Sequence, residues 1–387
     1  MNRRELLRMI GMTAGGAAMY QAMSSLGLAS ESPYTGPKPL DKAPKGASVL
    51  VLGAGIAGMV AAYELRNAGY KVQVLEYNAR AGGRNWSLRG GDTYTELGGF
   101  TQHCQFDPGL YFNPGPWRLP YHHRGILNYC KVLGVPLEAF VQVDYNAYLH
   151  SENAFGGEPQ RLRTINADYQ GHVAELLAKV TQNHRLDEQV SLEDQEKLLE
   201  SLRDWGALDH QYAYTKGTAS SLRRGFEKDP GGGLSGYSVP SQPIALQDLV
   251  DSKLWSHLAQ GWDYEKQTPL FQPVGGMGRI GEAFGRELGS LIRYNTKVVD
   301  IHQDDRGVTA TFEDSSMPGS PRQAATADWC VCTIPLSILG QIPMNVGRDM
   351  KEAIDAVPYT SSVKIGLQFK RRFWEEDDQI FGGISYT

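Results

Sequence analysis

Cysteine is scarce in this sequence, and its cysteines are not spaced as in a metal site. Four cysteines stand among 387 residues, too few for a scaffold held together by disulfides. A single residue separates Cys330 from Cys332, whereas a zinc knuckle needs a gap of two or more. We therefore interpret the cysteines as buried thiols, with a disulfide as an unsupported alternative, and expect no bound metal.

The sequence also lacks an excess of positive charge. Lys and Arg number 38 against 43 Asp and Glu, which leaves a net charge of -5 at pH 7. No basic field is present to hold a polyanion, so we do not expect nucleic acid as a partner. The overall composition is that of a globular protein, and the length predicts two or three domains able to enclose a small-molecule ligand.

Acidic residues are missing between Glu5 and Glu31 near the N-terminus. Arg3 and Arg4 precede a mildly apolar run rich in glycine and alanine, which is typical of a signal peptide and not of a membrane span. The arginine pair resembles a bacterial twin-arginine leader, a route that exports folded proteins. We therefore expect export to the periplasm or medium, and no stable insertion in a membrane.

The leader and the start of the ordered chain divide at about residue 30. We expect residues 1–29 to be the signal peptide and residues 30–46, which are rich in proline, to be a linker. The alternative is an amphipathic N-terminal helix that is never removed, in which case the protein would stay in the cytoplasm.

Residues 48–76 have the pattern of a strand, a glycine turn, a helix and a second strand. In a G-x-G-x-x-G turn, the first glycine permits the tight turn and the second lets backbone approach a pyrophosphate. The third lets the helix pack on the strand, and the phosphates lie at the helix N-terminus. The residues expected to hold a dinucleotide cofactor here are Gly53, Gly55, Ile56, Ala57 and Gly58.

Glu76 ends the second strand about twenty residues after the turn, where a carboxylate binds the ribose hydroxyls of the adenosine. A carboxylate at this position disfavours a 2′-phosphate, and therefore NADP. This unit by itself leaves a flavin and a nicotinamide cofactor as alternatives.

Residues 80–84 (Arg-Ala-Gly-Gly-Arg) resemble the R-x-G-G-R element of the flavin-dependent amine oxidases. The resemblance implies FAD as the cofactor, with Arg84 as a bidentate donor to its pyrophosphate. A basic surface turn is the alternative. Residues 96–99 are similar to the acid-x-Gly-Gly turn of the same family, which implies that Gly98 and Gly99 lie near the isoalloxazine.

Residues 115–120 (Gly-Pro-Trp-Arg-Leu-Pro) resemble a segment of the L-amino-acid oxidases, with Trp117 in place of the usual methionine. In that family the arginine binds the α-carboxylate of the substrate, which implies this role for Arg118, because its planar fork pairs both carboxylate oxygens. A structural ion pair of Arg118 is the alternative. The resemblance also implies that Gly115 and Pro116 line the cofactor, together with these two side chains.

Two later segments extend the resemblance. A strand through Val298 is similar to the family strand whose valine backbone meets the adenine. Residues 362–367 resemble the strand that carries a lysine beside the flavin, which implies that Lys364 hydrogen-bonds a water at flavin N5. A lysine on the solvent face of that strand is the alternative.

We therefore expect an α/β protein with a Rossmann-like FAD-binding domain of the GR2 type. A mixed α+β substrate domain accompanies it, and a polar stretch with helical spacing predicts a largely helical insert. The expected ranges are 47–105 and 270–340 for the FAD-binding domain, 106–150 and 341–387 for the substrate domain, and 151–269 for the insert.

The likeness continues to the last residue, in what resembles the middle of the substrate domain. Family members continue into a segment that returns to the FAD-binding domain and supplies aromatic residues to the substrate pocket. We therefore expect this chain to be a fragment, with a natural truncation as the alternative.

The resemblance implies FAD-dependent oxidation of an L-amino acid to a 2-oxo acid, with O2 as second substrate and with ammonia and hydrogen peroxide as products. Within the family, monoamine or polyamine oxidation and amino-acid 2-monooxygenation stay open. From another class, a non-catalytic flavin-binding fragment stays open. A homo-oligomer is compatible with the sequence.

Overall fold

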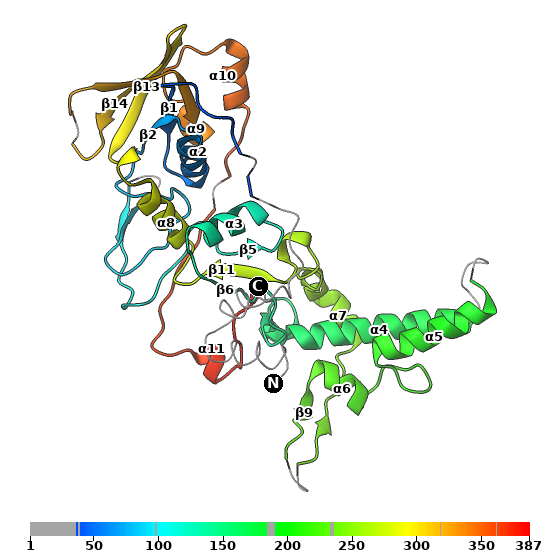
Figure 1. Cartoon of the computed structure of the whole chain (residues 1–387). Helices are drawn as coiled ribbons and strands as arrows, with labels where there is room; N and C mark the ends of the chain where they lie inside the picture. Colours follow the sequence, from blue (N-terminus) through cyan, green and yellow to red (C-terminus); the bar gives the residue numbers. More distant parts are fainter. Residues whose placement is uncertain are drawn as a thin grey trace, which may run out of the picture. The chain divides into compact units, whose positions relative to one another are not determined.

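The computed structural model describes residues 36–387, with the exception of 38, 97–98, 184–189, 233–235, 318 and 361. The expected signal peptide and Gly98 therefore lie outside the described residues. The chain forms two compact units (Figure 1). The first contains the described residues up to Phe140 and Pro269–Gln368, and the second contains Val141–Thr268 and Phe369–Thr387.

This division groups 106–140 with the ranges expected to bind the cofactor, so the expected domain ranges stay a prediction.

A four-stranded parallel sheet forms the centre of the first unit. Its order is β12-β2-β1-β16. A helix, α2, connects β1 to β2, so the predicted strand-helix-strand unit is confirmed. The bounds are Ser48–Leu52 for β1, Ile56–Asn67 for α2, Lys71–Leu75 for β2, Ile292–Arg293 for β12 and Trp329–Cys332 for β16.

Both faces of the parallel sheet are covered, as is usual for parallel strands. On one face, Val49 and Val51 pack with Met59 of α2 and Phe284 of α8 (Gly278–Leu288). On the other face, Leu50 and its neighbours pack against an antiparallel three-stranded sheet. That sheet consists of β13 (Thr296–Asp304), β14 (Gly307–Asp314) and β15 (Gln323–Ala327).

Smaller elements complete the first unit. One short sheet has the order β5-β11-β6, and a separate hairpin pairs β3 with β4. The bounds are Thr93–Thr95 for β3, Thr101–His103 for β4, Leu119–Pro120 for β5, Arg124–Val132 for α3, Leu137–Ala139 for β6, Leu270–Pro273 for β11, Leu336–Leu339 for α9 and Arg348–Asp355 for α10.

The second unit is largely helical and contains most of the range expected to form the helical insert. Helices α4 and α5 lie side by side (Figure 1), and a Cβ on Gly206 would come within 2.3 Å of the Ala174 Cβ. The helix bounds are Leu162–Gln182 for α4, Leu192–Gly206 for α5, Thr218–Arg224 for α6, Leu246–Ser252 for α7 and Phe373–Glu376 for α11. Two hairpins accompany them: Tyr148–Leu149 (β7) with Gln160–Arg161 (β8), and Phe226–Lys228 (β9) with Val239–Pro240 (β10).

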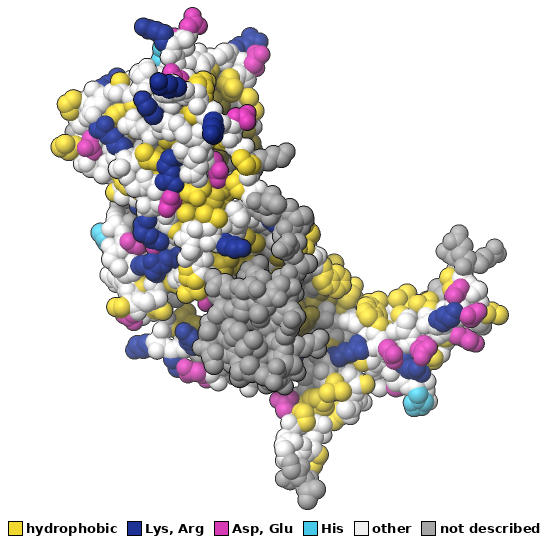
Figure 2. Space-filling view, in the orientation of Figure 1, with side chains coloured by type: hydrophobic (Ala, Val, Ile, Leu, Met, Phe, Trp, Pro, Cys, Tyr) yellow, Lys and Arg dark blue, Asp and Glu magenta, His cyan; other side chains and the backbone are white. Residues whose placement is uncertain are grey.

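Apolar side chains remain exposed along α4 and α5 (Figure 2), among them Leu176, Leu177 and Leu192. Over the described ranges, the helices do not combine the length and apolar character that a bilayer crossing requires.

One predicted strand is wrong. Residues 362–367 form no strand in the structure, and Val363, Ile365 and Leu367 are 85%, 75% and 71% exposed. The alternation is real, because a Cβ on Gly366 would contact the Phe112 ring at 2.9 Å on the opposite side. A strand also needs a neighbour for its backbone groups, and no described strand pairs with this segment.

Candidate functional site

The glycine turn between β1 and α2 leaves open space at the helix N-terminus. A Cβ on Gly58 would lie 2.0 Å from the Gly53 carbonyl oxygen, so the third glycine is required for packing. A Cβ on Gly55 would meet nothing within 4 Å. Because α2 begins at Ile56, the first-turn N–H groups of Ile56 and Ala57 have no helical acceptor, and this turn fits a pyrophosphate.

The R-x-G-G-R turn lies directly against the glycine turn. The Gly82 N–H donates to the Ala54 carbonyl at 2.8 Å, and a Cβ on Gly83 would approach the Gly55 Cα at 3.3 Å. Arg84 is exposed, and no described residue accepts a hydrogen bond from its guanidinium. Its side chain is thus available to a phosphate beside the turn.

Glu76 is 4% exposed and is held by the protein itself. One carboxylate oxygen accepts the Ala54 N–H at 2.6 Å, and the other accepts the Asn78 N–H at 2.8 Å and its side-chain amide at 2.6 Å. A carboxylate has about four acceptor positions, so capacity for a ribose hydroxyl remains. The carboxylate also fastens the turn, a structural role that its position in the sequence did not indicate.

Val298 lies in the strand that adjoins Glu76. The Thr296 N–H donates to the Glu76 carbonyl at 2.7 Å, and the Val298 side chain is buried in the core beneath the sheet. The register shifts between Val298 and Asp300, and such a bulge leaves backbone groups outside the ladder. The structure thus brings the glycine turn, Glu76 and the strand expected at the adenine together.

A backbone contact joins the predicted substrate segment to the R-x-G-G-R turn. A Cβ on Gly115 would lie 2.0 Å from the Arg84 carbonyl oxygen, so only glycine fits there. Pro116 is exposed beside it. Lys364 reaches the same segment, because its ammonium donates to the Gly115 carbonyl and to the Asn113 carbonyl at 3.4 Å.

Two cations lie over the ring of one tryptophan in this segment. The Arg118 Cζ lies 5.7 Å from the Trp117 ring centroid, and the Lys364 Nζ lies 5.0 Å from it. Arg118 is half-buried, and no carboxylate among the described residues pairs with it. Desolvation and, secondarily, the charge of Arg118 lower the pKa of Lys364. The site is a cationic pair without a counter-ion from the described chain.

A buried network that the sequence did not predict supports the Lys364 acceptors. The Ser87 hydroxyl donates to the Asn113 Oδ1 at 2.6 Å and accepts the Gly278 N–H at 2.9 Å. The Met277 N–H donates to the same Asn113 oxygen at 3.1 Å. These bonds fix the side chain of Asn113 to the start of α8. Neither Ser87 nor Asn113 has a sequence signal, because their partners are far away along the chain.

Gly99 lies in the turn of an exposed hairpin between β3 and β4. Its φ is +91°, which favours glycine, and its N–H donates to the Glu96 carbonyl at 3.0 Å. A Cβ there would meet nothing within 4 Å. The described residues do not bring Gly99 to the glycine turn, so its expected place near an isoalloxazine stays a prediction.

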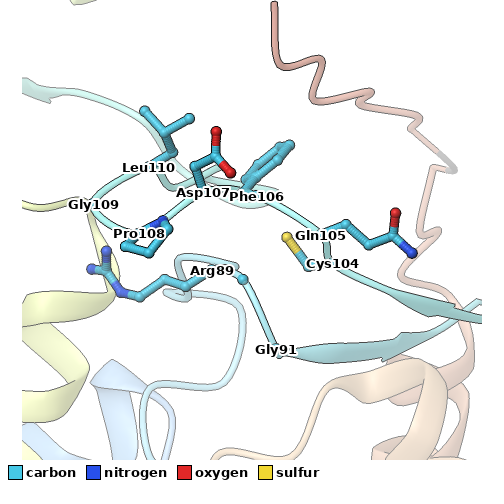
Figure 3. Close-up of a pocket in the computed structure, with 10 residues that line it drawn as sticks. Arg89, Gly91, Cys104, Gln105, Phe106, Asp107, Pro108, Gly109 and Leu110 are labelled. Atoms are coloured by element: carbon cyan, nitrogen blue, oxygen red, sulfur yellow. The ribbon is translucent and has the colours of Figure 1, made fainter.

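Residues 89–91 and 104–110 line a pocket of about 450 Å³, with the Cys104 thiol and the Arg89 side chain in its wall (Figure 3). Arg89 is already engaged, since its guanidinium donates to the Gly275 carbonyl and lies over the Tyr111 ring. None of the predicted site residues lines this pocket. Its volume therefore does not bear on the roles expected of Arg118 and Lys364.

Comparison with protein families gives one match across most of the chain. The family model described as flavin containing amine oxidoreductase matches residues 56–387. An L-amino-acid oxidase of Bothrops pauloensis is 30% identical over 349 residues, which are 88% of this chain and 62% of that protein. An L-amino acid oxidase of Bothrops pictus is also 30% identical over 349 residues, with 88% and 63% covered.

The chain thus spans less than two thirds of the length of these curated relatives. Among solved structures, a putrescine oxidase bound to putrescine is similar at 18% identity and a TM-score of 0.42, over 80% of this chain and 63% of that one.

Proposed function

Because the chain belongs to the family of flavin-containing amine oxidoreductases, we propose that the whole protein oxidises an L-amino acid to a 2-oxo acid. The cofactor is FAD, in agreement with the expectation from the sequence. The relatives named L-amino-acid oxidase support the amino acid as substrate. The site supplies an independent argument.

The half-buried guanidinium of Arg118, which has no carboxylate partner in the described chain, carries the proposal. A structural ion pair would neutralise it, and none is present among these residues. A planar guanidinium matches both oxygens of a carboxylate, and the ammonium of Lys364 on the same ring adds positive charge. An α-carboxylate is the anion that an amino acid offers and an amine lacks.

The chain contributes binding and orientation to the reaction. When bound, FAD would supply the two-electron redox chemistry that converts the amino acid to an imino acid, with O2 reduced to hydrogen peroxide and water hydrolysing the imino acid to the 2-oxo acid and ammonia. Arg118 fixes the substrate by its carboxylate and so orients the Cα–H. Lys364, held by two backbone carbonyls, donates a hydrogen bond to a water in the site.

For cofactor binding, we propose a GR2-type arrangement. The Gly55 backbone and the N-terminus of α2 would hold the pyrophosphate, with Arg84 as a cationic partner. Glu76 would accept from the ribose, and the backbone near Val298 would meet the adenine. The open space at Gly55 and the exposed Arg84 support this arrangement.

The deciding experiment compares an L-amino acid with its decarboxylated amine in the whole, FAD-loaded protein. We expect Arg118→Ala to lower kcat/KM for the amino acid by about 30- to 1000-fold, equivalent to about 2–4 kcal/mol for charge-assisted bidentate bonds. Arg118→Lys keeps the charge without the fork and should recover only part of this loss. The amine, which never used the carboxylate site, should lose little.

Flavin content is matched between the variants, so that a loss of cofactor is not mistaken for a loss of substrate binding. A wild type that prefers the amine, or an equal loss for both substrates in Arg118→Ala, would replace this proposal with an amine oxidase. Incorporation of an oxygen atom into an amide product would instead indicate a monooxygenase. A flavin-loaded protein with no turnover would leave only a binding role.

A further inference from the structure

Trp117 occupies an unusual position for an exposed aromatic side chain. It is 40% exposed, and it packs against one aromatic ring, Phe140, at a centroid distance of 6.1 Å. Its burial therefore contributes only part of what a core tryptophan would contribute. Two cations also lie over its ring, Arg118 at 5.7 Å and Lys364 at 5.0 Å from the centroid.

Both distances lie within the range of about 6 Å in which a cation is attracted to an aromatic face. Two like charges near one site repel each other, and the lowered pKa of Lys364 reflects this repulsion after desolvation. The electron-rich indole offsets that repulsion, because it attracts each cation separately. A leucine of similar position would leave the repulsion without compensation.

The two cations differ in how they are held. Lys364 has two backbone carbonyl acceptors, those of Asn113 and Gly115. For the Arg118 guanidinium, the described residues provide no hydrogen bond or ion pair, and the ring of Trp117 is its aromatic contact. The indole is thus the element that sets where the guanidinium lies relative to the ammonium.

We infer that Trp117 is a positioning residue, which holds the Arg118 guanidinium and the Lys364 ammonium together as one carboxylate-binding site. The inference rests on the proposed function for the identity of the anion. The contact geometry itself does not depend on that function. A binding site for a planar carboxylate needs both positive groups in fixed places before the substrate binds. The ring of Trp117 holds them there.

The test uses Trp117→Leu, which removes the aromatic face, and Trp117→Phe, which keeps a smaller one. Trp329→Leu is the matched control. Trp329 is 50% exposed in the same unit and contacts the Tyr70 ring at 6.0 Å, but no cation lies over it among the described contacts. Each variant is prepared as the whole protein with FAD, and flavin content is matched.

The first measurement is steady-state oxidation of an L-amino acid and its decarboxylated amine. We expect Trp117→Leu to lower kcat/KM for the amino acid by about 3- to 30-fold, the range of one or two cation–π contacts. The loss should appear in KM as well as kcat, since substrate binding itself is weakened. Trp117→Phe should recover most of it, and amine oxidation should lose less than amino-acid oxidation, because the amine makes no use of Arg118.

The second measurement does not depend on turnover. Acetic anhydride is added to the flavin-free protein, and acetylation of Lys364 is followed by peptide mass spectrometry. Removal of the ring takes away a group that stabilises the charged ammonium and so raises the share of the nucleophilic free amine, so Lys364 of Trp117→Leu should be acetylated several-fold faster. Trp117→Phe and Trp329→Leu should stay close to wild type.

The two proposals fail in different ways. If wild type oxidises amino acids but Trp117→Leu matches Trp329→Leu in both measurements, the positioning role is overturned and the proposed function stands. If wild type prefers amines while Lys364 acetylation responds to Trp117→Leu, the positioning of the cations stands and the carboxylate is the wrong anion. If Trp117→Leu does not fold, a Trp117→Phe variant that loses amino-acid oxidation as completely as Arg118→Ala would overturn the inference, and one that retains it supports the aromatic face.

Discussion

At the scale of single residues, two glycines of one turn are needed for different reasons: Gly55 leaves space for the cofactor, and Gly58 lets the helix pack. Gly55 has an ordinary backbone conformation, φ −70°, and open space around its Cβ direction. We expect Gly55→Val to keep the fold and lose FAD binding, because the new side chain occupies the phosphate space. Gly58→Ala would meet the Gly53 carbonyl at 2.0 Å and should lower the thermal stability of the flavin-free protein.

The measurements are flavin absorbance after purification and the melting temperature without flavin. Full flavin content in Gly55→Val would contradict the pyrophosphate position.

Glu76 leads to a second prediction at this scale. Its buried carboxylate accepts from the N–H groups of Ala54 and Asn78, and an amide would turn a donor toward one of them. We expect Glu76→Gln to cost about 1–3 kcal/mol of unfolding free energy even without flavin. Urea unfolding of the flavin-free variant measures this cost, with the exposed Glu282→Gln as control. Stability equal to that control would leave Glu76 with a ligand role only.

At the scale of elements, a buried ion pair connects the helices of the second unit. Asp168 on α4 is fully buried and accepts from Arg224 at 2.6 and 2.9 Å. It also accepts from the Tyr214 hydroxyl at 2.7 Å and the Ile244 N–H at 2.9 Å. Burial, and then the charge of Asp168, raises the pKa of Tyr214, so the phenol remains a donor.

We expect Asp168→Asn to destabilise this unit by about 3–5 kcal/mol, because it leaves the Arg224 guanidinium buried without a counter-charge. The exposed pair of Glu193 with Lys197 on α5 provides the control, since Glu193→Gln should cost less than about 1 kcal/mol. Chemical denaturation followed by circular dichroism measures both variants. Equal midpoints would show that the buried network does not hold α4 to α6.

At the scale of the whole molecule, the N-terminal arginines concern where the protein acts. Residues 1–35 are outside the described structure, so we propose export from the sequence alone. Arg3 and Arg4 both changed to Lys should retain the precursor in the cytoplasm with its flavin content unchanged. Immunoblots of cell fractions, with a Sec-exported protein as control, give the result. An unchanged yield in the periplasm would remove the twin-arginine proposal.

The sequence by itself determined the features that depend on short-range chemistry. The turn at residues 53–58 needs glycines for φ and for close packing, and the strands beside it need runs of buried β-branched or leucine side chains. The helices of the second unit follow from local periodicity in the same way. Family membership also came from such motifs, and the family match agrees.

Only the tertiary structure decided which distant segments meet. The contact of Gly115 with the Arg84 carbonyl, and of Lys364 with residues 113–115, joins backbone groups up to 251 positions apart, and no local pattern encodes such pairs. The strand expected at 362–367 is a case in which the local pattern was present but the tertiary contact was not. Alternation of side chains sets its two faces, but a strand exists only where a neighbour satisfies its backbone hydrogen bonds.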